Sequence, residues 1–498
     1  MGLDVGTTAV KGVVLEPGRG IVVAAQAAQE LLSPHPGWAE MQPRAWWDGA
    51  VAVLRELLDS PECPAGAVAG IGIAGMVPAL VLLDESGRPV RDSIQQNDAR
   101  TAPQIERLRG LLDQEEFFRL TGGSLNQQSL APKMLWLTEH EPAAVSRTRW
   151  LMGSYDYLNY QLTGAISVES NWALESGFAS LAAMDWHGPF VRAAGLRPEQ
   201  LPPIRRPDEI VGEVTPDAAR TTGLSPGTPV VAGCADHVAS AFAAGLIEDG
   251  DLNIKFGGAG DILYCIDGLD TDPRLFIDYH LVPGKFLLNG CMASSGSLVK
   301  WFAREIAGLG RGMAAPDYAA LDEQAAGLEP GPDSLVVLPY FIGEKTPLHD
   351  PLARGVVFGL SLHHRPAHMH RAIMEAVAFG FRHHLDVLRE RGHRPRRVVA
   401  TDGGARSPLW RQISADVLGL PVEYQADQPG SAFGAAFAAG IGTGVLTGWE
   451  SIRDYVRLAG RAEPRSGPAA RYDQLYQIYR ELYPLLQPLY RRLAELGS

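Results

Sequence analysis

A turn near the N-terminus has the residue types of a phosphate-binding site. Residues 4–8 read Asp-Val-Gly-Thr-Thr, and a lysine follows at position 11. Backbone N–H groups and hydroxyls in such a turn can bind phosphate oxygens, and a carboxylate at a strand end can hold a hydrated Mg²⁺. The turn predicts Asp4 as a metal ligand and the following phosphate-binding residues: Gly6, Thr7, Thr8 and Lys11. A plain β-hairpin turn has the same composition, so the turn alone leaves both interpretations open.

A second candidate is an aspartate between a predicted strand and a predicted helix. Residues 233–237 read Gly-Cys-Ala-Asp-His, and small residues suited to a helix follow at 238–245. Sheets of α/β proteins bind ligands at such strand ends, where Asp236 could accept a proton from a substrate hydroxyl. Aspartate is also a favoured helix N-cap, and taken alone the position favours that role. His237 is interpreted as a structural histidine.

Two glycine-rich turns in the second half could approach a nucleotide closely. Residues 256–260 read Phe-Gly-Gly-Ala-Gly, and residues 401–407 read Thr-Asp-Gly-Gly-Ala-Arg-Ser between a predicted strand and a predicted helix. A strand–glycine–helix junction directs amides at an anion and exposes bare backbone to a flat base. The candidates are Gly257, Gly258, Gly403, Gly404, Ala405 and Ser407. Neither stretch has the GxGxxG or GxxxxGK[ST] spacing, which disfavours dinucleotide-binding and P-loop folds.

The elements around these turns repeat in the two halves of the chain. Strand–turn–strand patterns cover residues 3–15 and 251–266, and the stretch 201–229 between the halves is irregular and rich in Pro and Gly. This predicts an α/β protein with domains at 1–228 and 229–498. Two hairpin turns, a strand-end aspartate and a late Gly-Gly junction together indicate actin-like (ribonuclease H-like) ATPase domains with an interdomain cleft.

Composition narrows the classes of partner. The 498 residues carry a formal net charge of −13, which argues against nucleic-acid and anionic-membrane partners because a basic face is missing. Four cysteines without a CxxC pair indicate neither a zinc site nor a disulfide framework and favour a cytoplasmic protein. No apolar run reaches the length of a transmembrane helix. Met1 precedes Asp4 by only two residues within a predicted strand, so the natural chain is expected to begin upstream.

The last segment predicts an amphipathic helix. Seven large residues fall on one face at helical spacing. They are Tyr472, Leu475, Tyr476, Tyr479, Leu482, Tyr483 and Leu486. Such a stripe favours core packing or a subunit contact over a cofactor site, and it makes a homodimer an open expectation.

At this point the sequence resembles the FGGY carbohydrate kinases along nearly its whole length. The stretch at 97–100, Asn-Asp-Ala-Arg, is similar to the family's Trp-Asn-Asp-x-Arg, and residues 355–375 fit the family signature at every constrained position. The other matching stretches are 4–8, 36–40, 233–245, 402–419 and 431–440. Residues 404–421 look closest to xylulokinases. In this resemblance the catalytic aspartate falls on Asp236.

The chain also departs from the pattern. Xylulokinases usually carry Gln-Met-His-Gly in the sugar-facing loop where this chain has Met76, Val77, Pro78 and Ala79. Losing the His and Gln side chains removes groups that bond sugar hydroxyls, which predicts altered substrate choice. Gln96 replaces the usual Trp, and Gly258 replaces a frequent Thr in the second phosphate turn.

The resemblance implies ATP-dependent phosphorylation of a hydroxyl on a small sugar or polyol, with Mg²⁺ and with Asp236 as the base. A ketopentose such as xylulose is favoured, and ribulose or an erythritol-like polyol stays open, as does a non-catalytic sensor that binds ATP and sugar. The implied substrate-binding residues are Met76, Val77, Pro78, Ala79, Asn97, Asp98 and Asp236. The implied Mg²⁺ ligands are Asp4 and Asp236.

Overall fold

The computed structural model describes residues 1–308, 317–425 and 430–496. The chain divides into two compact units. Unit 1 comprises Met1–Ile247, Ile277–Phe286 and Pro429–Val456, and unit 2 comprises Glu248–Phe276, Leu287–Gln428 and Arg457–Ser498. This division differs from the predicted one because residues 229–247 pack with the first sheet. This division does not test the predicted domain boundary between residues 228 and 229, which stays a prediction.

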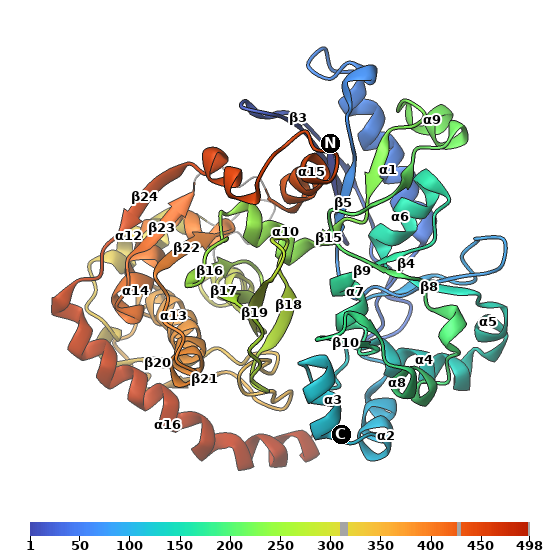
Figure 1. Cartoon of the computed structure of the whole chain (residues 1–498). Helices are drawn as coiled ribbons and strands as arrows, with labels where there is room; N and C mark the ends of the chain where they lie inside the picture. Colours follow the sequence, from blue (N-terminus) through green and yellow to red (C-terminus); the bar gives the residue numbers. More distant parts are fainter. Residues whose placement is uncertain (309–316, 426–429, 497–498) are drawn as a thin grey trace. The chain divides into compact units, whose positions relative to one another are not determined.

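The central sheet of unit 1 has five strands in the order β15-β5-β1-β2-β3 (Figure 1). The first three strands of the chain, β1 (Gly2–Val5), β2 (Ala9–Glu16) and β3 (Gly20–Ala28), form an antiparallel meander. Two short strands, β5 (Gly72–Gly75) and β15 (Cys234–Ala235), continue the sheet in parallel with β1. This confirms the strand–turn–strand opening expected from β-branched residues around a glycine turn.

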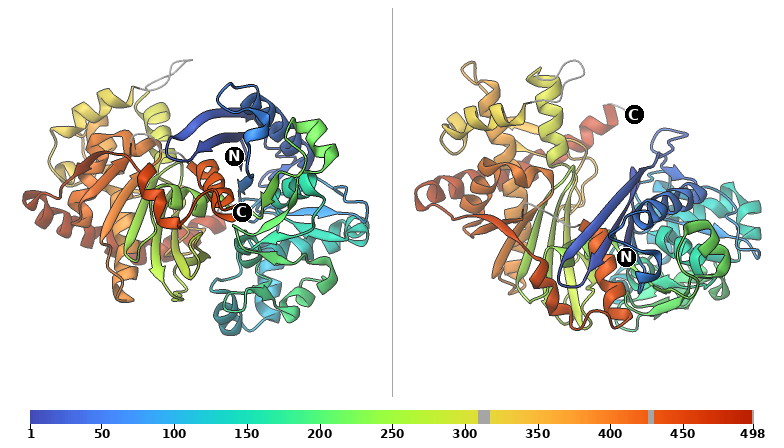
Figure 2. Two further views of the ribbon diagram at one scale, coloured as in Figure 1. Left: turned by 45° about the horizontal axis from the view of Figure 1, so that its top comes forward. Right: turned by 90° about the horizontal axis from the view of Figure 1, so that it is seen from above.

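Helices cover both faces of this sheet. A β-carbon built on Gly2 would meet Ala432 and Ala436 of α15 (Gly430–Gly442), and one built on Gly12 would meet Val53 and Leu57 of α1 (Pro43–Leu58). Gly2 pairs with Val13, the neighbour of Gly12, so the two glycines point to opposite faces. Helix α15 therefore packs directly on β1, although it comes far later in the chain (Figures 1 and 2).

The predicted strand at 229–234 is divided by a glycine. Residues Pro229–Val231 form β14, which pairs with β13, and the chain then turns at Gly233 before β15. Gly233 has φ +84°, and a β-carbon there would lie 2.0 Å from the backbone oxygen of Ile73. The single strand was therefore a wrong prediction, because only glycine permits this close, left-handed turn.

The other elements of the first 247 residues surround the sheet. They are β4 (Glu40–Met41), η1 (Ala65–Ala67), β6 (Val81–Leu83), β7 (Ser93–Ile94), α2 (Ala102–Leu111), α3 (Gln114–Thr121), α4 (Leu130–His140), α5 (Pro142–Arg147), β8 (Trp150–Met152), α6 (Ser154–Thr163), β9 (Val168–Glu169), α7 (Ser170–Glu175), β10 (Ala179–Ser180), β11 (Asp185–Trp186), α8 (Gly188–Ala193), η2 (Pro198–Gln200), β12 (Ile204–Arg205), β13 (Ile210–Glu213), α9 (Pro216–Thr222), β14 (Pro229–Val231) and α10 (Asp236–Ala243).

Unit 2 repeats the plan with a second strand–turn–strand. Its sheet contains β17-β16-β22-β23-β24 in that order, with β16 antiparallel to β17 and parallel to β22. These strands are β16 (Asp251–Phe256), β17 (Gly260–Asp267), β22 (Arg397–Thr401), β23 (Val422–Gln425) and β24 (Leu458–Ala462). The helix predicted after the 401–407 junction is present as α14 (Pro408–Leu418), and the longer α13 (Pro366–Glu390) packs against it. The expected pair of similar α/β plans is confirmed.

The remaining elements lie after residue 275. They are β18 (Phe276–Tyr279), β19 (Lys285–Met292), α11 (Gly296–Trp301), the π-helical η3 (Phe302–Ile306), α12 (Tyr318–Ala326), η4 (Pro332–Ser334), β20 (Val336–Leu338), β21 (Val356–Phe358), η5 (Gly403–Arg406), η6 (Trp449–Tyr455) and α16 (Ser466–Leu496).

The long C-terminal helix α16 lies at the red end of the ribbon in Figure 1, and its tyrosine face is part of the core. Tyr472, Tyr476 and Tyr479 are buried, and α16 contacts α14 and β20. The hydroxyl of Tyr479 lies 2.9 Å from that of Tyr340. Core packing is thus the correct interpretation of this stripe. Among the described residues, no helix is both long and apolar enough to cross a lipid bilayer.

Candidate active site

Three predicted stretches meet at one edge of the unit 1 sheet. Val5 pairs with Gly75, and Gly75 pairs with Ala235, in parallel strands. The residues that follow these strands are Gly6, Met76 and Asp236. The sheet therefore brings together the first phosphate turn, the loop at 76–79 and the candidate base, where parallel sheets bind their ligands.

Asp236 is the first helical residue of α10, and Ala235 occupies the N-cap position. The N-cap interpretation of Asp236 is therefore wrong. Oδ1 of Asp236 accepts a hydrogen bond of 2.7 Å from the backbone N–H of His237, and 39% of the side chain is exposed. A carboxylate at a helix N-terminus is stabilised by the helix dipole and stays available to a ligand.

His237 lies among three carboxyl groups. Its Nε2 is 3.1 Å from Oδ2 of Asp278 and 4.0 Å from Oε1 of Glu175, and its Nδ1 is 3.5 Å from Oδ1 of Asp236. Burial alone would lower the pKa of His237, but the charge of Asp278 and the bond to Asp236 raise it well above its usual value. These contacts favour the charged form of the ring, which lies between Asp236 and the buried Asp278.

Glu175, at the C-terminal end of α7, is the third carboxyl group of this cluster, and its pKa is shifted. Burial, reinforced by the negative charge of Asp278, raises the pKa of Glu175 well above its usual value. Its Oε1 has no hydrogen-bond partner among the described residues. Sequence reasoning missed Glu175 and Asp278, because neither follows a recognisable turn or lies near Asp236 in the chain.

The first phosphate turn is open. The N–H of Gly6 bonds to the carbonyl of Ala9, which closes the turn, while Thr8 and Lys11 are exposed and Thr7 is half-buried. Asp4 is also half-buried and lies directly opposite Lys11 in the antiparallel pair. The hydroxyls and the ammonium group are thus accessible to a phosphate, and the Asp4 carboxylate lies beside them.

The loop at 76–79 offers an apolar surface. Met76, Val77, Pro78 and Ala79 are all buried, and the carbonyl of Ala79 accepts a 2.8 Å hydrogen bond from Nε1 of Trp172. Since no side chain in this loop carries a polar group, its contribution to a ligand is limited to shape and to backbone atoms.

Asp98 holds an arginine in place. Its Oδ2 accepts hydrogen bonds of 2.7 Å from the backbone N–H of Ala39 and from Nη2 of Arg100, and the side chain is fully buried. Burial opposes ionisation, yet the bonds from Arg100 lower the pKa of Asp98 below its usual value. The guanidinium of Arg100 stacks 3.6 Å from the ring centre of Trp38. Asn97, beside it, is exposed.

In unit 2 the two glycine turns also share a sheet edge. Lys255 pairs with Thr401, so Gly257 and Asp402 both follow the ends of neighbouring parallel strands. A β-carbon built on Gly257 would lie 3.0 Å from Oδ2 of Asp402, and one on Gly404 would lie 2.7 Å from Cβ of Phe256. A side chain at position 404 would clash with Phe256, and one at position 257 would crowd Asp402, so both glycines serve this packing. The close approach to a nucleotide that the sequence predicts for them stays a prediction.

The second phosphate turn is fixed by the start of α11. The carbonyl of Gly257 accepts a hydrogen bond from the N–H of Gly296, and that of Gly258 accepts one from the N–H of Ser295. No described heavy atom lies within 4 Å of a β-carbon built on Gly258 or Gly403. Both positions are open to a ligand.

Ser407 serves the fold of the junction. Its Oγ accepts a hydrogen bond from the N–H of Trp410, which caps α14, and donates one of 2.6 Å to Oδ2 of Asp322. Ala405 is fully buried. Of the predicted adenosine-binding residues, Gly403 and Gly404 thus provide the bare backbone, and Ser407 and Ala405 support it.

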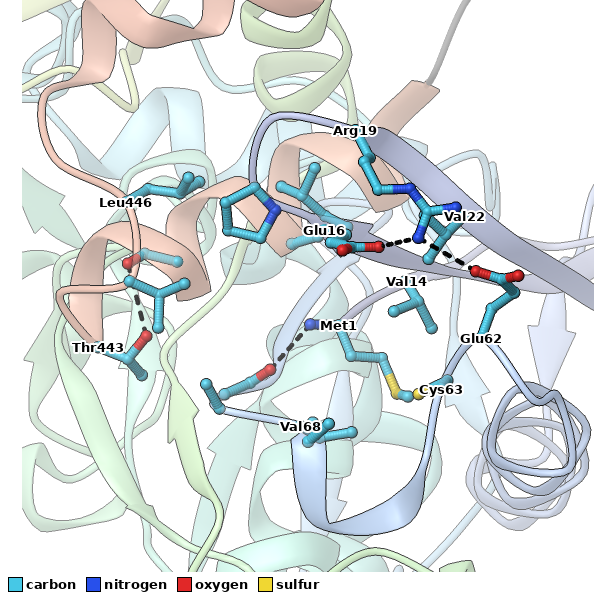
Figure 3. Close-up of a pocket in the computed structure, with 18 of the residues that line it drawn as sticks. Met1, Val14, Glu16, Arg19, Val22, Glu62, Cys63, Val68, Thr443 and Leu446 are labelled. Atoms are coloured by element: carbon cyan, nitrogen blue, oxygen red, sulfur yellow. Dashed lines mark hydrogen bonds and ion pairs between the residues drawn. The ribbon is translucent and has the colours of Figure 1, made fainter.

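A cavity of about 470 Å³ lies elsewhere in unit 1 (Figure 3). Its lining includes Met1, Val14, Cys63 and Leu446, and Arg19 bridges Glu16 and Glu62 beside it. The lining contains none of the predicted site residues. This cavity is therefore separate from the candidate active site.

Comparisons with known proteins agree with this arrangement. Residues 1–243 match the N-terminal domain of the FGGY family of carbohydrate kinases, and residues 275–443 match its C-terminal domain. The chain belongs to the FGGY family of carbohydrate kinases. It is 31% identical to the xylulose kinase of Escherichia coli (strain K12) over 98% of this chain and 99% of that protein.

Other relatives support the same assignment. A solved xylulose kinase from Rhodospirillum rubrum superimposes with a TM-score of 0.92 and 44% identity, covering 98% of this chain and 99% of that one. The gluconokinase of Bacillus subtilis (strain 168) is 26% identical over 99% of this chain and 97% of that protein. The protein is thus a two-domain FGGY kinase of actin-like ATPase fold, an ATP-dependent carbohydrate kinase.

Proposed function

We propose that this FGGY kinase phosphorylates a hydroxyl of a ketopentose such as xylulose, with Asp236 as the catalytic base. The observation that carries the proposal is the exposed carboxylate of Asp236, at the same sheet edge as the first phosphate turn and the loop at 76–79. The similarity to xylulose kinases supports the choice of sugar. The apolar loop keeps ribulose or an erythritol-like polyol as the second candidate, because it lacks side chains that bond sugar hydroxyls.

The residues divide the work of phosphoryl transfer. The phosphates of ATP bind the two turns through Gly6, Thr7, Thr8, Lys11, Gly257 and Gly258. Adenosine lies against Gly403 and Gly404, whose backbone Ala405 and Ser407 hold in shape. Because the transition state is loose, positioning and charge stabilisation are the main contributions of the protein. Asp236 orients the sugar hydroxyl and accepts its proton late, while the ring of His237 fixes the carboxylate.

The carboxylates of Asp4 and Asp236 fit a divalent cation. Both are strand-end oxygen donors with accessible surface, which suits a Mg²⁺ ion held largely through water. The ion neutralises charge on the phosphates when ATP is bound.

On the sugar side, Met76, Val77, Pro78 and Ala79 form an apolar wall, and Asn97 provides an exposed amide. Asp98 acts on the substrate through Arg100 and its stack on Trp38. This assignment makes Asp98 a positioning residue.

Replacing the base tests the proposal. We expect Asp236→Ala to lower kcat by about 10³-fold while the Kd for ADP stays within about threefold, because the base acts only on the reacting hydroxyl. Coupled ADP release with xylulose, ribulose, polyols and sugar acids measures turnover and identifies the substrate. Near-normal turnover of the variant contradicts the assigned base. ADP release that no sugar stimulates favours a non-catalytic sensor.

A homodimer and a cytoplasmic location complete the proposal. The four cysteines, all within the described residues, form no disulfide, which suits a reducing compartment. Since the tyrosines of α16 are used in the core, self-association would use its other face, where Leu485, Leu489 and Leu493 are exposed. Sedimentation analysis of Leu489→Glu tests this, and an unchanged dimer excludes that face.

A further inference from the structure

Asp402 has a backbone conformation that its residue type does not favour. Its φ of 70° and ψ of −175° fall in a region occupied almost only by glycine. Residues held there in spite of strain cluster at functional sites, where the surrounding structure fixes them. Glycine would adopt this backbone conformation without strain. What Asp402 has and glycine lacks is a carboxylate, so the carboxylate is the feature that needs an explanation.

The side chain of Asp402 lies against the second phosphate turn. A β-carbon built on Gly257 would lie 3.0 Å from Oδ2 and 4.0 Å from Cγ of Asp402. The pairing of Lys255 with Thr401 fixes the two turns side by side. The carbonyl of Asp402 also accepts a hydrogen bond from the N–H of Ala405, which begins the adenosine junction. The carboxylate therefore lies where the two nucleotide-binding turns meet.

A fixed negative charge beside a phosphate-binding turn has an electrostatic consequence. A carboxylate and a phosphate a few ångströms apart repel each other, and the repulsion weakens nucleotide binding unless a cation lies between them. A divalent cation takes carboxylate oxygens and water together, so it can turn this repulsion into attraction.

We propose that Asp402 faces the divalent cation that accompanies the nucleotide and makes nucleotide binding by this kinase depend on that cation. The proposal rests on the assignment of residues 257–260 to the phosphates. Asp402 contacts the cation or its water shell, whereas Asp236 acts on the sugar hydroxyl.

The experiment measures ADP binding by calorimetry, with Mg²⁺ and with EDTA, for the full chain and for Asp402→Asn and Asp402→Gly. Without a cation, both variants should bind ADP about tenfold more tightly than the unaltered protein, because the repulsion is gone. With Mg²⁺ the variants should bind ADP no more tightly than the unaltered protein does. The ratio of the ADP affinity with Mg²⁺ to the affinity with EDTA should therefore fall about tenfold. Only Asp402→Gly should also raise the apparent Tm of the free protein, because asparagine keeps the strained backbone.

Asp333 supplies a matched control. It is a second aspartate of unit 2 at positive φ, 49°, and it pairs with His363 and His368. Asp333→Asn also removes the carboxylate of an aspartate at positive φ, but one that does not lie at the glycine turns. The control should leave the Mg²⁺ dependence of ADP binding unchanged.

Two results overturn the proposal. One is an affinity ratio in both Asp402 variants equal to that of the unaltered protein. The other is an equal loss of affinity with and without Mg²⁺, which indicates that the Asp402 carboxylate accepts a hydrogen bond from a ribose hydroxyl. The sugar screen tests the proposed function separately. If the Asp402 variants change the Mg²⁺ dependence of ADP binding but no sugar is turned over, the proposed function is contradicted and the role of Asp402 is supported. If xylulose is turned over but the variants leave the Mg²⁺ dependence unchanged, the proposed function is supported and the role of Asp402 is contradicted.

Discussion

At the scale of single residues, the charge of each carboxyl group around His237 follows from its surroundings. Asp278 is only 2% exposed and lies 3.1 Å from Nε2 of His237, whereas burial, reinforced by the charge of Asp278, raises the pKa of Glu175 well above its usual value. Asp236 alone combines contact with His237 and broad exposure. In this cluster the carboxylate of Asp236 is accessible to solvent, and its contact with His237 fixes its orientation.

The two inner carboxyl groups should respond differently to amide substitution. Asp278→Asn removes the partner of His237 and should lower kcat roughly 10- to 100-fold, the effect usual for residues that orient a site ligand, with little change in the KM for ATP. Because burial favours the neutral form of Glu175, Glu175→Gln should keep kcat within about threefold. Steady-state kinetics at neutral pH measure both. A Glu175→Gln variant as slow as Asp278→Asn contradicts these charge states.

Sequence could predict part of this site. Asp4 and Asp236 were predicted because strand ends and glycine turns leave a local signal, and the register brought Gly6, Met76 and Asp236 to one edge. Asp278 and Glu175 left no such signal, since their role depends on burial against His237. Asp98 matched a family motif, but only the contacts show that it is committed to Ala39 and Arg100.

At the scale of elements, the joint between β14 and β15 decides where Asp236 points. The glycine turn there was the one detail of this segment that apolar patterning could not predict, because Val-Val-Ala-Gly-Cys-Ala reads as one continuous buried strand. The break is imposed by the close approach of Gly233 to the carbonyl of Ile73 in β5.

Alanine at this joint should damage both the fold and the site. Gly233→Ala places a β-carbon 2.0 Å from the Ile73 oxygen in left-handed backbone, and it should cost about 3 kcal/mol or more and disturb the β5–β15 pairing. Gly258→Ala is the matched control, because its β-carbon would enter open space. Urea unfolding measures both free energies. Equal stability of the two variants would show that the joint tolerates a side chain.

At the scale of the whole molecule, the duplicated plan could be predicted, but the return of α15 to the first sheet could not. Both strand–turn–strand patterns were visible in the sequence, and both were found. Helix α15, however, returns to unit 1 and packs on β1, β5 and α10. Its residues Phe433–Phe437 are apolar or small and buried on all sides, so they carry no amphipathic direction from which a partner could be inferred.

Buried histidines should make the stability of the folded chain depend on acid. Burial lowers the pKa of His280 and of His384 to about 4, against 6.5 in the unfolded chain. Between these values the unfolded state binds more protons, so the free energy of unfolding falls as pH drops from about 6.5 toward 4, by about 3 kcal/mol for each fully protonated group.

The dependence can be assigned by substitution. Nε2 of His384 shares a hydrogen bond with the hydroxyl of Thr346, and Nδ1 bonds to the carbonyl of Gly380. His384→Gln therefore keeps a polar side chain at this position and removes the group that titrates. Urea unfolding from pH 7 to pH 4.5 should show a smaller loss for this variant than for the unaltered protein, while exposed His363→Gln should follow the unaltered curve. If all three curves coincide, protonation of His384 does not contribute to acid unfolding, and the loss must come from the carboxyl groups that the native chain holds ionised.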